Sequence, residues 1–287
     1  MPSNSHFRRR TSRSLIDRFG YPHLLAGTLA LVTATILLGV AAKATGSGLA
    51  CQANWPQCDA GPFNLLPANL PSFYEWFHRF VAMFAGFAII GSALAAWRSS
   101  SVDKRVTALV VLGMLLTPIQ VTLGRETVTQ YTMDILSLHF WTAVLIFSLF
   151  VVATVLVWQS TLTASHVTGA LALGFVALPL HVALSPTDLG VVTEYTPTIQ
   201  LLQYGVTLAL LASPIVATMV GRWRLEDRRV VPLFSVSVVL AFAVAYLGRQ
   251  AVMNFSSTLD VVYLAAVALL AIAFAAGLGL TRSASSA

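Results

Sequence analysis

Apolar residues run through most of this chain in long blocks, and polar residues gather in the short stretches between them. Each block is about 20 residues long, the length an α-helix needs to cross a hydrocarbon layer about 30 Å thick. Because the apolar residues are continuous and do not alternate, the pattern predicts helices and excludes a barrel of strands. The predicted spans are residues 22–43, 74–97, 105–124, 137–159, 163–184, 198–220, 231–248 and 259–280.

The composition agrees with a protein whose partner is the lipid bilayer. Hydrophobic residues make up 57% of the 287 positions and charged residues only 10%, whereas a soluble domain carries about 25% charged residues. This excludes an ordinary water-soluble enzyme and also a disordered chain. The net charge of +6 does not indicate a nucleic-acid partner, because the basic residues are gathered between the spans.

The basic residues predict the orientation. Most of them fall on one side of the eight spans, and the positive-inside rule then places both chain ends in the cytoplasm. We expect a multi-pass protein of a cell membrane, in a prokaryotic plasma membrane rather than a mitochondrial inner membrane. The residues on this side are Arg8, Arg9, Arg10, Arg13, Arg18, Arg98, Lys104, Arg105, Arg222, Arg224, Arg228, Arg229 and Arg282.

A repeated hexamer divides the chain into two halves. The residues from Leu123 to Val128 end the third predicted span, and those from Leu247 to Val252 end the seventh, 124 positions later. The pattern predicts an all-α fold of two pseudo-symmetric four-helix bundles related by a parallel repeat. We expect a basic tail at 1–21, a first half at 22–160 with a long outer loop at 44–73, a second half at 161–282, and a short tail at 283–287.

Ionisable residues inside spans are costly and mark functional sites. Glu75 and His78 share one helix face at the outer end of the second span, and His139 lies at a similar depth in the fourth. Two histidines at equal depth on facing helices suit a haem held through its iron by two imidazoles. The alternative is two separate histidines that are each hydrogen-bonded in the interior.

The second half keeps polar groups at the matching positions but no imidazole. An offset of 124 carries His139 onto Tyr263, and an offset of 125 carries His78 onto Gln203. His181, near the outer end of the fifth span, is a possible substitute ligand there. The second half therefore lacks the histidine pair of the first.

The outer side also carries the two cysteines and three arginines. Cys51 and Cys58 face the oxidising side, where they can form either a structural disulfide or a redox-active pair. Arg79, Arg125 and Arg249 lie at the outer boundary, where a guanidinium can hold carboxylates in bidentate fashion or extend to lipid headgroups.

The first half resembles the haem A synthase family, integral-membrane enzymes that convert haem O to haem A for terminal oxidases. The resemblance lies in four stretches, in order: Gly46-Ser47-Gly48-Leu49-Ala50-Cys51 with Trp55-Pro56-Gln57-Cys58, Glu75-Trp76-Phe77-His78-Arg79, Gln120-Val121-Thr122-Leu123-Gly124, and Leu138-His139. Eight spans in two four-helix halves also agree with the family.

The resemblance implies an oxidoreductase that oxidises one methyl group of the haem O ring to a formyl group. His78 and His139 would be axial ligands of the haem iron, Glu75 the essential carboxylate, and Arg79 and Arg125 cofactor-binding residues. Cys51 and Cys58 would form a disulfide that orders the loop above the site. Haem O, haem O synthase and an electron donor would be partners, and a homo-oligomer is also expected.

The chain departs from the family pattern in the second half, where a second histidine pair would hold a haem b cofactor. Three possibilities follow: no second haem, a haem held by His181 or Tyr263, or a divergent family member that binds one haem without making haem A. Two rival functions stay open. One is a non-catalytic haem b protein that passes electrons from quinone to an outer partner, and the other is a small-solute transporter.

Overall fold

The computed structural model describes residues 20–51, 54–55, 58, 67, 69–187, 190–226, 230–254 and 257–283. The basic residues of the N-terminal tail, Arg228 and Arg229, the side chain of Arg282 and residues 284–287 lie outside the described part. The membrane orientation inferred from these charges therefore stays a prediction.

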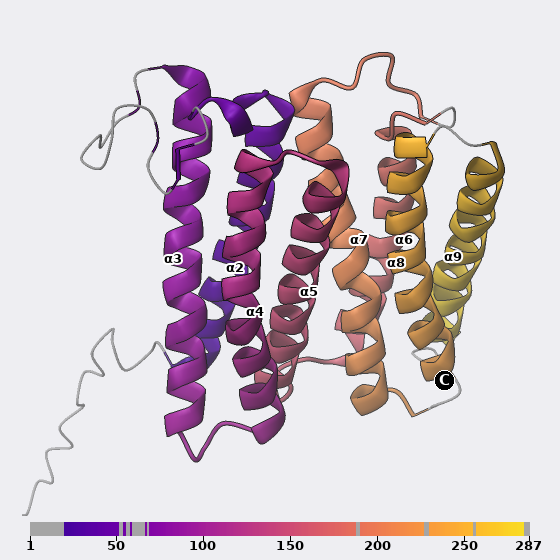
Figure 1. The fold of residues 1–287 in the computed structure, drawn as a ribbon. Coiled ribbons are helices and arrows are strands. Elements are labelled where there is room, and N and C mark those ends of the chain that lie inside the picture. Colours follow the sequence, from indigo (N-terminus) through magenta and orange to yellow (C-terminus); the bar gives the residue numbers. More distant parts are fainter. Residues whose placement is uncertain are drawn as a thin grey trace, which may run out of the picture.

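The described part of the chain is helical, with eight long helices, one short 3₁₀ turn and no strand (Figure 1). All eight are long and apolar enough to cross a membrane, which confirms the predicted all-α multi-pass class. The helices are α2 (Tyr21–Ala44), α3 (Leu70–Arg98), α4 (Lys104–Thr129), α5 (Met133–Val157), α6 (Ala164–Ala183), α7 (Pro197–Arg224), α8 (Val230–Asn254) and α9 (Ser257–Ser283), and the 3₁₀ turn is η1 (Ser47–Leu49).

Several helices extend farther outward than their apolar blocks. Helix α3 begins at Leu70 because the side chain of Asn69 accepts a hydrogen bond from the Ser72 amide at 2.9 Å, and α5 begins beside Thr132 for the same reason. Helices α4 and α8 continue to Thr129 and Asn254. The loops expected at 125–136 and 249–258 are consequently much shorter, and Arg125 and Arg249 belong to helices.

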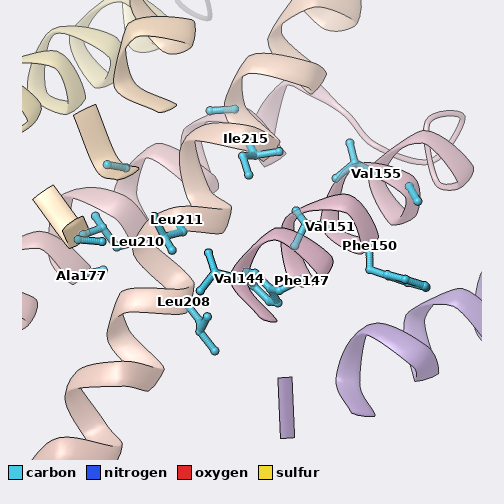
Figure 2. Packing of buried hydrophobic residues seen from close by; sticks show 14 of the residues in the cluster. Val144, Phe147, Phe150, Val151, Val155, Ala177, Leu208, Leu210, Leu211 and Ile215 are labelled. Carbon is cyan, nitrogen blue, oxygen red and sulfur yellow. The ribbon is translucent and has the colours of Figure 1, made fainter. Parts of the chain in front are cut away.

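The eight helices pack as two closed rings of four. Helices α2, α3, α4 and α5 contact one another in sequence, and α5 returns to α2; α6, α7, α8 and α9 repeat this pattern. Helix α7 of the second ring packs against both α2 and α5 of the first. Along this seam Val144 and Phe147 of α5 lie beside Leu208 of α7 (Figure 2). The apolar seam holds the two rings together.

Candidate functional site

The two histidines of the first ring have the same setting on different helices. His78 of α3 packs against Gly39 of α2, where an added Cβ would lie 2.9 Å from the imidazole Cε1 atom. His139 of α5 packs against Gly124 of α4, where the corresponding distance is 3.1 Å. In each case the absence of a glycine side chain makes room for the imidazole. The first ring of helices therefore presents two imidazoles that are positioned in the same way from opposite helices.

The two imidazoles lie close enough to interact electrostatically, so they belong to one region of the first ring. Each also reaches the residue one helical turn before its glycine. His78 bonds to the backbone of Thr35, and His139 Nε2 lies 3.4 Å from the side-chain nitrogen of Gln120. The Nδ1 atoms of both rings are buried without a hydrogen-bond partner, although both residues keep part of their surface accessible. Each histidine therefore has a ring nitrogen available to a ligand.

This pair of histidines suits a metal whose other ligands come from a bound cofactor and not from the protein. The described residues contain no group of three or more His, Cys, Asp or Glu side chains that could hold a bare metal ion. A haem iron needs only axial ligands from the protein, because the porphyrin supplies the four nitrogens in the plane. The orphaned ring nitrogens and the two glycine contacts therefore fit a haem better than a free ion.

A buried ion pair lies one turn outside the histidines. Glu75 is only 7% exposed, and its Oε1 atom accepts a hydrogen bond from Arg79 Nε at 2.9 Å. Arg79 Nη1 also donates to the backbone oxygen of Asn54 in the outer loop, at 2.9 Å. Since Glu75 precedes His78 by three residues, the carboxylate and the imidazole share one face of α3. The expected role of Arg79 in binding a cofactor stays a prediction.

The outer loop is fixed to the beginning of α3. Cys51 and Cys58 form a disulfide with their Cα atoms 4.5 Å apart, and both residues are buried. Ser72 of α3 is fully buried and donates from its hydroxyl to the Ala50 carbonyl at 3.4 Å. With the contact between Arg79 and Asn54, these bonds hold the described part of the loop close to Glu75. Pro56 and Gln57 lie outside the described residues.

The remaining two predicted arginines have different settings. The Arg125 side chain is 56% exposed and lies 3.6 Å from Glu126, so its role in cofactor binding stays a prediction. Arg249 joins the two rings, since it donates to Tyr204 of α7 at 3.0 Å and to Ser137 of α5 at 3.2 Å. It also lies over the Phe140 ring at 5.4 Å from the centroid. These contacts give Arg249 a structural role at the seam.

Several residues of this site carried no separate signal in the sequence. Gly39 and Thr35 lie within an apolar span, and Ser72 and Asn54 lie among other polar loop residues. Gly124 was visible only as part of the repeated hexamer. A glycine inside a helix costs about 1 kcal/mol relative to alanine. That cost is a weak hint of a close packing partner, and it does not identify the partner.

Comparison with known proteins agrees with this geometry. A family model described as cytochrome oxidase assembly protein matches residues 22–187, which include Glu75, His78 and His139. A heme A synthase of Bacillus licheniformis is 29% identical over 123 residues, covering 42% of this chain and 40% of that protein. A heme A synthase of Geobacillus kaustophilus is 27% identical over 143 residues, covering 49% of this chain and 44% of that protein.

A second kind of relative also matches. A protoheme IX farnesyltransferase of Halobacterium salinarum is 36% identical over 104 residues, covering 36% of this chain and 22% of that protein. The chain thus spans less than half the length of each of these three relatives. The family model, in contrast, covers more than half of this chain. On that match, and on the histidine pair that it contains, the chain belongs to the cytochrome oxidase assembly protein family, the family of the haem A synthases.

Proposed function

We propose that the first ring binds haem O between His78 and His139, which act as axial ligands of the iron. The observation that carries this is the matched setting of the two imidazoles, each against a glycine and each with an orphaned ring nitrogen. When bound, the haem supplies the iron and the ring methyl group that is oxidised. The residues of the chain orient the haem and exclude water from it.

In this proposal Glu75 is the catalytic carboxylate for oxidation of the methyl group to a formyl group. If the oxygen comes from water, converting a methyl group to a formyl group releases four protons and passes four electrons to an acceptor outside the chain. A buried carboxylate beside the haem can accept these protons. It can also stabilise positive charge that develops at the ring carbon. Arg79 holds the Glu75 carboxylate in place through its Nε atom, and it ties the outer loop down over the same point.

The substrate's chemistry also fits the setting. Haem O carries a long apolar tail, and a protein made of eight apolar helices can receive such a molecule from the bilayer. The relative named protoheme IX farnesyltransferase is, by its name, an enzyme that attaches such a tail to a haem. We therefore propose haem O synthase as a functional partner. The relatives come from prokaryotes, which supports a prokaryotic plasma membrane as the location.

The direct test is to express the chain in cells that make haem O and lack haem A. We expect haem A to appear in the extracted pigments, as identified by chromatography and mass spectrometry. Bound haem with no haem A would instead support the rival function, a non-catalytic haem protein in electron transfer. Purified protein that binds no haem would contradict both.

The contact between Gly39 and His78 gives a further prediction. Gly39→Ala should reduce haem affinity about 10–100-fold, the range seen when groups that orient a metal ligand are changed. The reason is that the new Cβ would lie 2.9 Å from the His78 ring and push it away. Haem titration followed by absorbance measures the effect.

Gly27→Ala is the matched control, because Gly27 is on the same helix and has no atom within 4 Å of an added Cβ. We expect its haem affinity to equal that of the unchanged protein. Equal affinities in the two variants would show that the Gly39 contact does not position the imidazole.

A further inference from the structure

The second ring carries different side chains where the family resemblance implies a second haem. Tyr263 of α9 occupies the position of His139, and Gln203 of α7 occupies that of His78. The nearest imidazole, His181, is on α6. The structure provides three separate tests of whether these residues fit a haem: burial, the glycine contact and the hydrogen bonds.

The polar side chains at the matching positions are buried to different extents in the two rings. The residues His78 and His139 remain partly accessible, although their Nδ1 atoms are enclosed. Tyr263 is 0% exposed, His181 is 5% exposed and Gln203 is 7% exposed. The polar side chains of the second ring are therefore already enclosed by protein.

The contact with a glycine is preserved in the second ring of helices, but a phenol makes it instead of an imidazole. An added Cβ at Gly248 would lie 3.0 Å from the Tyr263 ring, almost the distance between Gly124 and His139. The phenol thus occupies the place of the imidazole.

Gln203 is occupied by a hydrogen bond to the outer loop. Tyr195 donates from its hydroxyl to Gln203 Oε1. Burial, with the nearby Tyr204, raises the pKa of the Tyr195 phenol, while Arg249 opposes the shift. The phenol therefore stays protonated and remains a donor. This bond holds Gln203 against the loop, and an amide is in any case a poor substitute for an axial imidazole.

The positions of the protons around His181 can be assigned by counting the donors and acceptors of its hydrogen bonds. The single hydroxyl proton of Thr207 is donated to the Gln203 carbonyl at 2.7 Å. The contact of 2.8 Å between His181 Nδ1 and Thr207 Oγ1 must then use a proton on Nδ1. In the neutral ring Nε2 is consequently an acceptor, and it is buried without a partner.

The Tyr263 hydroxyl is a buried donor that also lacks a partner. Its ring is 6.5 Å from the His181 ring, and both rings lie beside Gly248. A haem would need space that these side chains already fill, so the residues of the second ring do not fit it.

We infer that this chain binds a single haem, in the first ring, and that the second ring instead encloses a hydrogen-bonded network of Tyr195, Gln203, Thr207 and His181, with the Tyr263 ring packed beside His181. The inference rests on the proposed haem site at His78 and His139. The network places polar side chains where a cofactor would lie, and it links α6 and α7 to the loop before α7.

The test is titration of the purified full-length chain in detergent with iron protoporphyrin IX, followed by absorbance and pyridine haemochrome analysis. We expect one haem per chain. The double variant His78→Ala/His139→Ala should bind none, and Tyr263→Phe and His181→Ala should still bind one. Thermal unfolding and size-exclusion chromatography show that each variant is folded.

The outcomes separate the inference from the proposed function. Two haems on the unchanged chain, one of them lost in the double variant, would overturn the inference and leave the first-ring site in place. One haem on the unchanged chain that the double variant retains would overturn both the inference and the first-ring site. Loss of the haem from folded Tyr263→Phe or His181→Ala would also overturn it. No haem on the unchanged chain would overturn the proposed function as well.

Thr207→Val supplies an independent measurement, because it removes the acceptor of the Nδ1 proton. A lower unfolding temperature with one haem still bound supports the network. An unchanged unfolding temperature contradicts it.

Discussion

Replacing either His78 or His139 by alanine is expected to remove bound haem from the protein and to abolish haem A formation. In the proposed site each imidazole would supply one of the two protein ligands of the iron, and each occupies a space that its glycine neighbour leaves for it. Loss of a ligand should cost more than the roughly 10–100-fold seen when groups that orient a ligand are changed. Reduced-minus-oxidised spectra of membranes measure the haem, and pigment extraction measures haem A.

A matched control is His166→Ala. His166 lies in the first turn of α6, where its ring bonds to Thr163, and it is exposed. Its loss should lower stability by about 1 kcal/mol, as for other helix caps, and leave haem content unchanged. A normal yield of haem A in both first-ring variants would remove His78 and His139 from the site.

Replacing Glu75 by glutamine is expected to leave haem binding intact and to slow haem A formation by about 10²–10⁴-fold, the usual contribution of a general acid or base. Glutamine has the same shape, and its oxygen can still accept the hydrogen bond from Arg79 Nε that Glu75 accepts at 2.9 Å. It cannot take up a proton or carry negative charge. The haem content, measured by absorbance, should therefore stay unchanged while the rate of haem A formation falls.

Glu126→Gln is the control, because it makes the same change from carboxylate to amide at a different glutamate. Glu126 is at the outer end of α4, and its carboxylate bonds to Gln130 and Thr129. We expect its rate to equal that of the unchanged protein. An unchanged rate in Glu75→Gln would exclude Glu75 from the chemistry, and loss of haem in that variant would indicate that it holds the site together instead.

The number and type of the helices could be predicted from hydropathy because the bilayer imposes a single rule on every span. The ends of the helices could not. Helix α3 begins four residues before the expected start because Asn69 caps it, and α4 continues past Arg125. Local hydrogen bonds at the membrane surface set these ends, and an apolar window does not contain that information.

The candidate site was predicted in part. Glu75, His78 and His139 stood out because ionisable groups are rare in spans, and their common depth follows from their positions in the sequence. The partners of these residues did not stand out. Arg79 bonds to Glu75 and Asn54, and Arg249 bonds to Ser137 and Tyr204 across the seam. Depth along a helix can be read from a sequence, but the direction in which each side chain points across the bundle cannot.

The sequence by itself determined the membrane class, the eight spans and the three first-ring residues, because each depends on hydropathy or on spacing along one helix. The tertiary structure decided which groups meet. It placed the imidazoles against Gly39 and Gly124, it buried Tyr263, and it bonded Gln203 to Tyr195 and His181 to Thr207. The physical reason is that helix rotation and packing are fixed by contacts between distant segments, and those contacts decide whether a polar residue faces a ligand or a neighbouring side chain.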